Sequence, residues 1–192
     1  MAEVNEEIAK AYFEEVCGYL TKSDYCFQKT SKRPHKRGGV GPSDIDLLIM
    51  HPNEGGLYGK RAMVSVKGWH DYILTKYNCK TKESWTKGFE KQDLDAAEEF
   101  FKTKDFSKIL VVPRVEKNNR EFIEKYVKTS KGIDCLIDFP FMINEIFKKF
   151  KKPRYYKESE VLQTLAVAYR HNIKSLIKEN EELREKLENL QR

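Results

Sequence analysis

The sequence contains no apolar run long enough to span a bilayer, and its first residues lack the basic and apolar regions of a secretory signal peptide. Its four cysteines, Cys17, Cys26, Cys79 and Cys135, form neither a CxxC pair nor the Cys/His spacing of a zinc site. Scattered thiols of this kind are typical of proteins in a reducing compartment. We therefore expect a cytoplasmic protein with no membrane partner.

Charge is abundant instead, with 34% charged residues and a net charge of +6 over 192 residues. Residues 29–37 and 148–157 each hold several basic side chains and no acidic one. Such runs are often ordinary solvated surface, but two of them favour a polyanionic partner, here DNA. The side chains predicted to contact nucleic acid are Lys32, Arg33, Lys36, Arg37, Lys151, Lys152 and Arg154.

Hydrophobic periodicity predicts alternating helices and strands. Helices are expected over residues 5–22, 94–102, 121–127 and 141–150, and strands over 24–30, 44–50, 61–68, 109–113 and 135–138. The turn at residues 51–56 predicts an antiparallel hairpin, whereas residues 70–90 give no clear pattern. This order of elements predicts an α/β domain over residues 1–157, with a mixed sheet flanked by helices.

Residues 158–192 read as one long helix that begins after a break at Pro153. One seam of its heptads holds Ala166, Ile173, Asn180 and Leu187, and the other holds Leu162, Tyr169, Leu176, Leu183 and Leu190. A single Asn in a leucine-rich seam favours a parallel two-stranded coiled coil. We therefore expect a homodimer; the alternative is one amphipathic helix packed on its own domain, as the wider apolar stripe before residue 173 indicates.

Polar residues alternate with apolar ones in two neighbouring strands. Asp44 and Asp46 share one face of the first strand, opposite Ile45, Leu47 and Ile49, and Ser65 and Lys67 share one face of the second, opposite Val64 and Val66. If the strands pair, a carboxylate and a lysine meet on one face of the sheet. That combination can hold a divalent metal ion and act on a phosphodiester.

The order helix, strand, Asp-bearing strand, x-x-Lys strand, helix and strand resembles the PD-(D/E)xK nuclease superfamily, which includes Holliday-junction resolvases and restriction endonucleases. The resemblance covers roughly residues 5–115, and its most specific pieces are residues 44–49 and 64–67. It implies a restriction-endonuclease-like fold that uses Mg²⁺, for which Mn²⁺ substitutes.

By position, the resemblance makes Asp46 the metal ligand and Lys67 the catalytic lysine, with Asp44 as a supporting carboxylate. A glutamate on the first helix often completes such a site, and Glu15 is our candidate. Ser65 stands where the family has an acidic ligand, so a later glutamate is needed; Glu83 and Glu90 are the candidates. The expected catalytic set is therefore Lys67, Asp46, Glu15 and Ser65, and the metal set is Asp46, Asp44, Glu15 and Glu83.

Three functions remain open on this basis. The first is a dimeric, metal-dependent DNA endonuclease acting on duplex or branched DNA. The second is a nuclease-fold protein that binds DNA without cutting it, because Ser65 replaces a carboxylate. The third and lowest-ranked is a nucleotidyltransferase, since Asp44 and Asp46 form an Asp-x-Asp element but the Gly-Ser pair of that fold is missing at the required distance.

Overall fold

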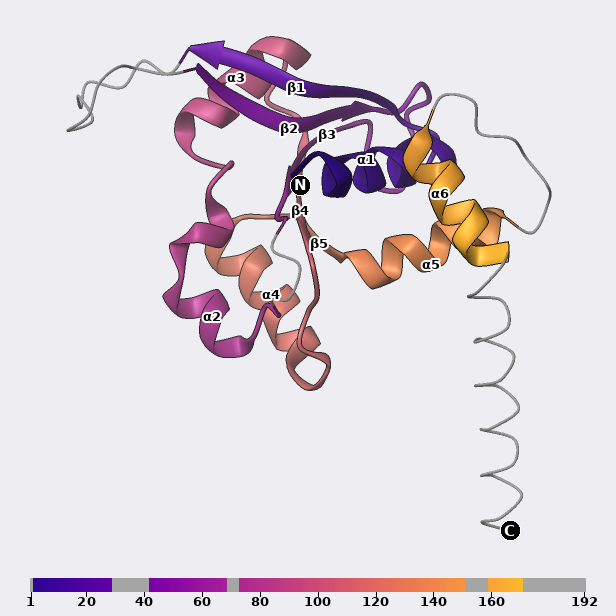
Figure 1. The fold of residues 1–192 in the computed structure, drawn as a ribbon. Helices are drawn as coiled ribbons and strands as arrows, with labels where there is room; N and C mark the ends of the chain where they lie inside the picture. The colour runs from indigo at the N-terminus through magenta and orange to yellow at the C-terminus, as the bar shows by residue number, and fades with distance from the viewer. Residues whose placement is uncertain (1, 29–41, 69–72, 151–158, 171–192) are drawn as a thin grey trace.

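The computed structural model describes residues 2–28, 42–68, 73–150 and 159–170 (Figure 1). The helices are α1 (Ala2–Ala11), the π-helix η1 (Tyr12–Val16), α2 (Lys76–Thr81), the 3-10 helix η2 (Glu83–Thr86), α3 (Lys91–Phe101), the 3-10 helix η3 (Lys117–Asn119), α4 (Arg120–Lys131), α5 (Phe139–Lys149) and α6 (Glu160–Ala168). The strands are β1 (Leu20–Gln28), β2 (Pro42–Met50), β3 (Arg61–Val66), β4 (Ser107–Val112) and β5 (Cys135–Asp138).

The five strands form one mixed sheet in the order β1-β2-β3-β4-β5. β1, β2 and β3 are antiparallel neighbours, whereas β3, β4 and β5 run parallel. The hairpin predicted between β2 and β3 is therefore confirmed, as is the mixed α/β class. Parallel neighbours need crossover connections, and α2 with α3 and then α4 supply them.

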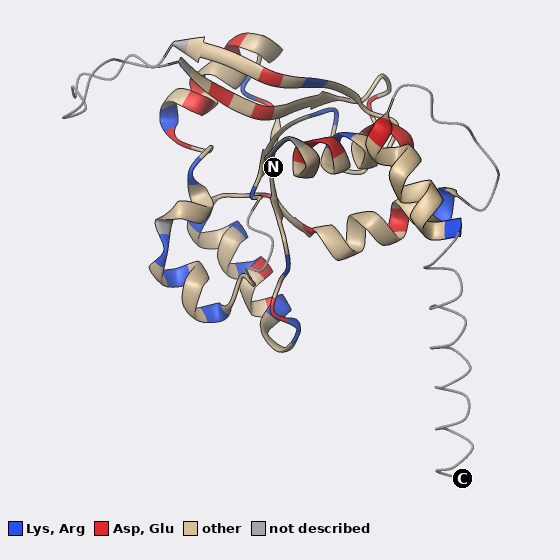
Figure 2. Cartoon of the chain, in the orientation of Figure 1, with Lys and Arg blue, Asp and Glu red and all other residues tan. Residues whose placement is uncertain are grey.

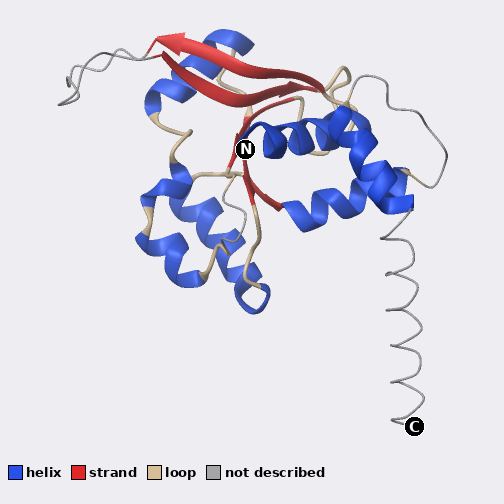
Figure 3. Ribbon diagram, in the orientation of Figure 1, coloured by secondary structure: helices blue, strands red, loops and turns tan. Residues whose placement is uncertain are grey.

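Helices cover both faces of the sheet (Figures 1 and 3). Side chains alternate along β4, so Ile109 and Val111 pack in the core under α1, α5 and α6, while Leu110 and Val112 pack under α2 and α4. α3 covers Leu48 and Met63 on that second face. These strand residues are almost fully buried, and each such aliphatic side chain stabilises the fold by roughly 1.5–3 kcal/mol.

Two local predictions from the sequence were wrong. The helix expected over residues 5–22 ends at Ala11, continues as one π-helical turn, and reverses at Gly18, whose φ of +75° suits glycine. Ile45 packs with Leu48 under α3 and does not share the core of Leu47 and Ile49. The β1–β2 pair is irregular next to Ile45, where Asp24 lies opposite Asp46 by register and has a φ of +50°.

α6 packs on the domain through Leu162 and Ala166, which are 3% and 5% exposed, and it contacts α1. The predicted coiled coil from residue 173 onward lies outside the described residues, as do the basic stretch at residues 29–37 and all but the first three residues of the one at 148–157. Within the described part of the chain, no helix combines the length and apolarity that a membrane crossing requires.

Candidate catalytic site

The candidate site lies where β3 parts from β2. The β2–β3 ladder has its last pair at Leu47 and Val64, so Asp46 and Ser65 would come next. Instead, the Val66 amide donates to Oδ2 of Asp46 at 2.5 Å, and the Lys67 amide donates to the Val111 carbonyl at 2.9 Å. The Asp46 carboxylate thus takes the place of a strand partner for β3.

Ser65 connects the two predicted functional groups. Its hydroxyl donates to Oδ2 of Asp46 at 3.1 Å and accepts from Nζ of Lys67 at 2.8 Å. The carboxylate and the lysine therefore meet on one face of the sheet, as the alternation in the sequence predicted. That face is the one covered by α2, α3 and α4.

The turn between η2 and α3 closes over this chain of hydrogen bonds. Nζ of Lys67 donates to the Lys87 carbonyl at 2.6 Å. Gly88 has a φ of +100°, and a Cβ built there would lie only 2.6 Å from Oγ of Ser65. Ser65 is 2% exposed under this turn, so a longer acidic side chain at position 65 has no space in this arrangement.

Burial dominates the electrostatics of both groups. It raises the pKa of Asp46 above its ordinary value, against the opposing effects of the Val66 amide, the Lys67 charge and the Ser65 hydroxyl; Asp44 adds a smaller upward effect. Burial also lowers the pKa of Lys67, although Asp46 and Asp93 oppose that shift. A half-buried lysine and carboxylate with displaced pKa values are typical of functional sites.

Asp93, at the start of α3, is a charged neighbour that the sequence did not single out as functional. It is 2% exposed, and its Oδ2 accepts from the Glu90 amide at 3.0 Å in a capping box. Its charge acts on Lys67. The capping pattern was visible in the sequence, but only the turn at Gly88 brings this helix start to β3.

The other predicted site residues lie in different places. Glu15 is exposed on η1, and its neighbour Glu14 hydrogen-bonds Thr21, which pairs with Ile49 toward the far end of β2. No described contact joins Glu15 to Asp46 or Lys67. Asp44 is exposed two residues before Asp46 on β2, and Glu83 begins η2, with its side chain outside the description.

The residues predicted to bind a metal ion do not form a cluster of three or more in the part of the chain described. Among those residues, no group of three or more His, Cys, Asp and Glu side chains is placed to hold an ion. Only one oxygen of Asp46, Oδ2, accepts hydrogen bonds from described residues. Oδ1 is thus the atom available to coordinate an ion.

Comparison of the chain with protein-family models, with curated proteins and with solved structures finds no match.

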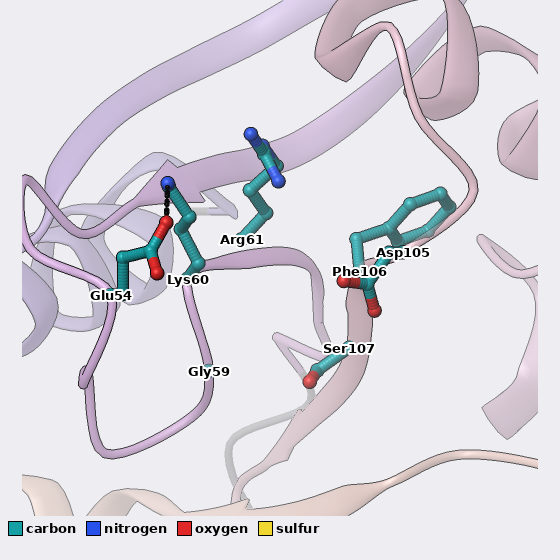
Figure 4. Close-up of a pocket in the computed structure, with 7 residues that line it drawn as sticks. All are labelled: Glu54, Gly59, Lys60, Arg61, Asp105, Phe106 and Ser107. Atoms are coloured by element: carbon teal, nitrogen blue, oxygen red, sulfur yellow. Dashed lines mark hydrogen bonds and ion pairs between the residues drawn. The ribbon is translucent and has the colours of Figure 1, made fainter.

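A separate hollow of about 470 Å³ opens at the other end of β3 (Figure 4). It is lined by Glu54, Gly59, Lys60, Arg61, Asp105, Phe106 and Ser107. Lys60 and Glu54 form an ion pair of 2.7 Å across its edge. Arg61 begins β3 and Lys67 follows its end, so about 20 Å of strand separates this hollow from the candidate site.

Proposed function

We propose that this protein is a metal-dependent DNA endonuclease with a restriction-endonuclease-like fold, acting as a dimer on duplex or branched DNA. The hydrogen-bonded chain Asp46–Ser65–Lys67, at the point where β2 and β3 diverge, is the observation that carries the proposal. The surrounding order α1-β1-β2-β3-α3-β4 is the one that the resemblance to PD-(D/E)xK nucleases leads us to expect.

The donor atoms suit Mg²⁺, because it prefers oxygen ligands and is often held by one or two carboxylates, with water and substrate phosphate completing its shell. Asp46 would hold the ion through Oδ1, with Asp44 as the second carboxylate. When bound, Mg²⁺ would activate a water molecule and offset charge on the phosphate.

Lys67 has two tasks in this proposal. Its ammonium is anchored by the Ser65 hydroxyl and the Lys87 carbonyl, which leaves its third proton to donate toward a phosphate oxygen or the attacking water. The half-buried position strengthens that interaction relative to water. The Ser65 hydroxyl lies between the two charged groups, and by donating to Asp46 it favours the ionised carboxylate against the effect of burial.

A protein that binds DNA without cutting it is the second candidate. Ser65 occupies the position at which the resemblance expects a carboxylate ligand. Gly88 packs so closely against Ser65 that a glutamate at position 65 would not fit. Fewer carboxylates weaken metal binding, so a site of this composition can lose catalysis while the basic surface still binds DNA.

The two candidates separate in a cleavage assay on supercoiled plasmid and on a branched duplex with Mg²⁺ or Mn²⁺. The wild type is expected to cleave, and Lys67→Met and Asp46→Asn are expected to lower the rate at least about a hundredfold. Lys91→Ala is the matched control, because it removes an exposed lysine side chain at the start of α3 that is not among the charges acting on Lys67.

Equal rates for the wild type and Lys67→Met would show that any cleavage comes from another source. DNA binding by a wild type that never cleaves would favour the second candidate. Nucleotide-dependent product without cleavage would identify the nucleotidyltransferase. Sedimentation of the full chain tests the dimer, and a monomer at micromolar concentration would contradict that part of the proposal.

A further inference from the structure

Charge is unevenly distributed over the described surface. Figure 2 shows acidic residues on α1, α3 and the β1–β2 ribbon, whereas basic residues are frequent on α2, α4 and their flanking turns. Lys76 and Lys80 lie on α2, and Lys125, Lys128 and Lys131 lie on α4. This group of basic side chains is separate from the basic stretches predicted from the sequence to bind nucleic acid.

Lys76 and Lys80 are held together by an aromatic ring. Their Nζ atoms lie 4.7 Å and 4.9 Å from the centroid of the Phe122 ring on α4. Phe122 in turn stacks on Tyr126, with centroids 6.1 Å apart and planes 14° apart. The two lysines are one helical turn apart, so their like charges repel, and the electron-rich face of Phe122 opposes that repulsion.

These ammonium groups are not neutralised by the described side chains. Both lysines are exposed, and neither forms an ion pair within the part of the chain that the structure describes. Glu116 is an acidic neighbour, and its Oε2 accepts from the Lys76 backbone amide at 3.0 Å without an ion pair to either ammonium group among the described contacts. Lys131 adds positive charge, since it and Lys80 both act on Cys79.

The lysine pair is connected to the candidate catalytic site. Only residues 82–86 separate the end of α2 from Lys87, whose carbonyl anchors Lys67. A linear polyanion that has one phosphate at Lys67 can therefore continue over η2 toward α2. A small anion would satisfy the lysine pair alone, whereas a longer polyanion could also contact the exposed Lys87 between α2 and the candidate site.

We propose that Lys76 and Lys80, positioned by Phe122, bind backbone phosphates of DNA whose reactive phosphate lies at Asp46 and Lys67. This inference rests on the proposed function, because it takes the same DNA as ligand. Lysines act as point charges toward phosphate, so the contacts contribute affinity and orientation but no sequence preference.

The test measures binding of a short fluorescein-labelled DNA duplex to the full chain in EDTA, where metal-dependent cleavage cannot occur. Lys76→Gln/Lys80→Gln is expected to weaken binding roughly tenfold at moderate salt and to lower the slope of log affinity against log salt by about 2, one unit for each lost phosphate contact. Lys22→Gln/Lys104→Gln removes the same charge from exposed sites on the acidic part of the surface and is expected to change both values little.

Phe122→Leu separates a positioned site from a general charge effect, because it keeps both lysines and removes the ring that holds them. It is expected to weaken binding severalfold at unchanged net charge. Circular dichroism and thermal unfolding check that each variant is folded. Phe122 is 36% exposed, so its replacement is expected to leave the buried core in place.

Unchanged binding by Lys76→Gln/Lys80→Gln beside a wild type that binds and cleaves DNA would overturn this inference alone. Equal losses in the two double variants would show a general charge effect and would also overturn it. A wild type that binds no duplex would overturn both this inference and the proposed function. Preference for poly-glutamate over DNA would make an acidic protein the partner and reject the nucleic-acid assignment.

Discussion

The Lys67 ammonium donates to the backbone carbonyl of Lys87, with 2.6 Å between Nζ and O. This contact ties the end of β3 to the turn that precedes α3, so the crossover segment fixes the position of the candidate catalytic lysine. Because a carbonyl is the acceptor, the contact does not depend on the Lys87 side chain. That side chain acts only through its charge, which lowers the pKa of Lys67.

Lys87→Ala should therefore raise the pKa of Lys67. Removing a nearby positive charge favours the protonated ammonium, so the lysine should titrate closer to its ordinary pKa. The ¹⁵N shift of the Lys67 side chain followed against pH measures this directly. Lys91→Ala on the next helix is the control, and an equal or downward shift for Lys87→Ala would contradict the electrostatic account.

Ser65→Ala should raise the pKa of Asp46 further. The Ser65 hydroxyl donates to the carboxylate and stabilises its charged form, so its loss favours the protonated form. If Asp46 must be ionised for cleavage, the acidic limb of the pH–rate profile moves to higher pH by the same amount. The ¹³C shift of the Asp46 carboxyl checks the pKa without any activity. An unchanged titration would show that the bond is too weak to matter.

Gly88→Ala should destabilise the fold by about 1–3 kcal/mol. The added methyl group would meet Oγ of Ser65 at 2.6 Å, and a φ of +100° is strained for any residue with a Cβ. Chemical denaturation measures the free energy of unfolding. Gly55→Ala is the matched control, since a Cβ there meets nothing within 4 Å. Equal stabilities for the two variants would mean that the turn relaxes without cost.

Asp138→Ala should lower the free energy of unfolding by about 2 kcal/mol. Asp138 caps α5 by accepting from the Phe141 amide at 3.2 Å, and its other oxygen accepts from Arg120 at 2.8 Å. Glu124 is the other partner of Arg120 and is more exposed than Asp138. Glu124→Ala should therefore lower the free energy of unfolding by less than about 1 kcal/mol. Asp138→Asn keeps the cap, so an intermediate value is expected from thermal unfolding.

The sequence was sufficient for the part of the site that depends on strand alternation. A period of two placed Asp46 and Lys67 on one face, and the turn at residues 51–56 paired their strands antiparallel. It could not reveal that pairing stops at Leu47 and Val64, because the alternation of polar and apolar residues continues past that pair in both strands.

Asp93 and Gly88 were not predictable from the sequence as parts of the site. Residues 70–90 lack clear periodicity, and the position of their turn over Ser65 depends on how η2 and α3 pack against the sheet. The first helix was predicted to run too far, to residue 22, for a related reason. The apolar residues of η1 continue the helical pattern, and the chain reverses only at Gly18.

The change from antiparallel to parallel pairing at β3 has a consequence for folding. β1, β2 and β3 are neighbours both in the sequence and in the sheet. The edge of β3 that faces away from β2 pairs with β4, which follows in the sequence only after α2 and α3. Until residues 107–112 arrive, the apolar edge Ala62–Val66 has no strand beside it and is open to pairing with another chain. Aggregation during synthesis should therefore respond to how fast α3 forms, since that helix brings the missing strand to this edge.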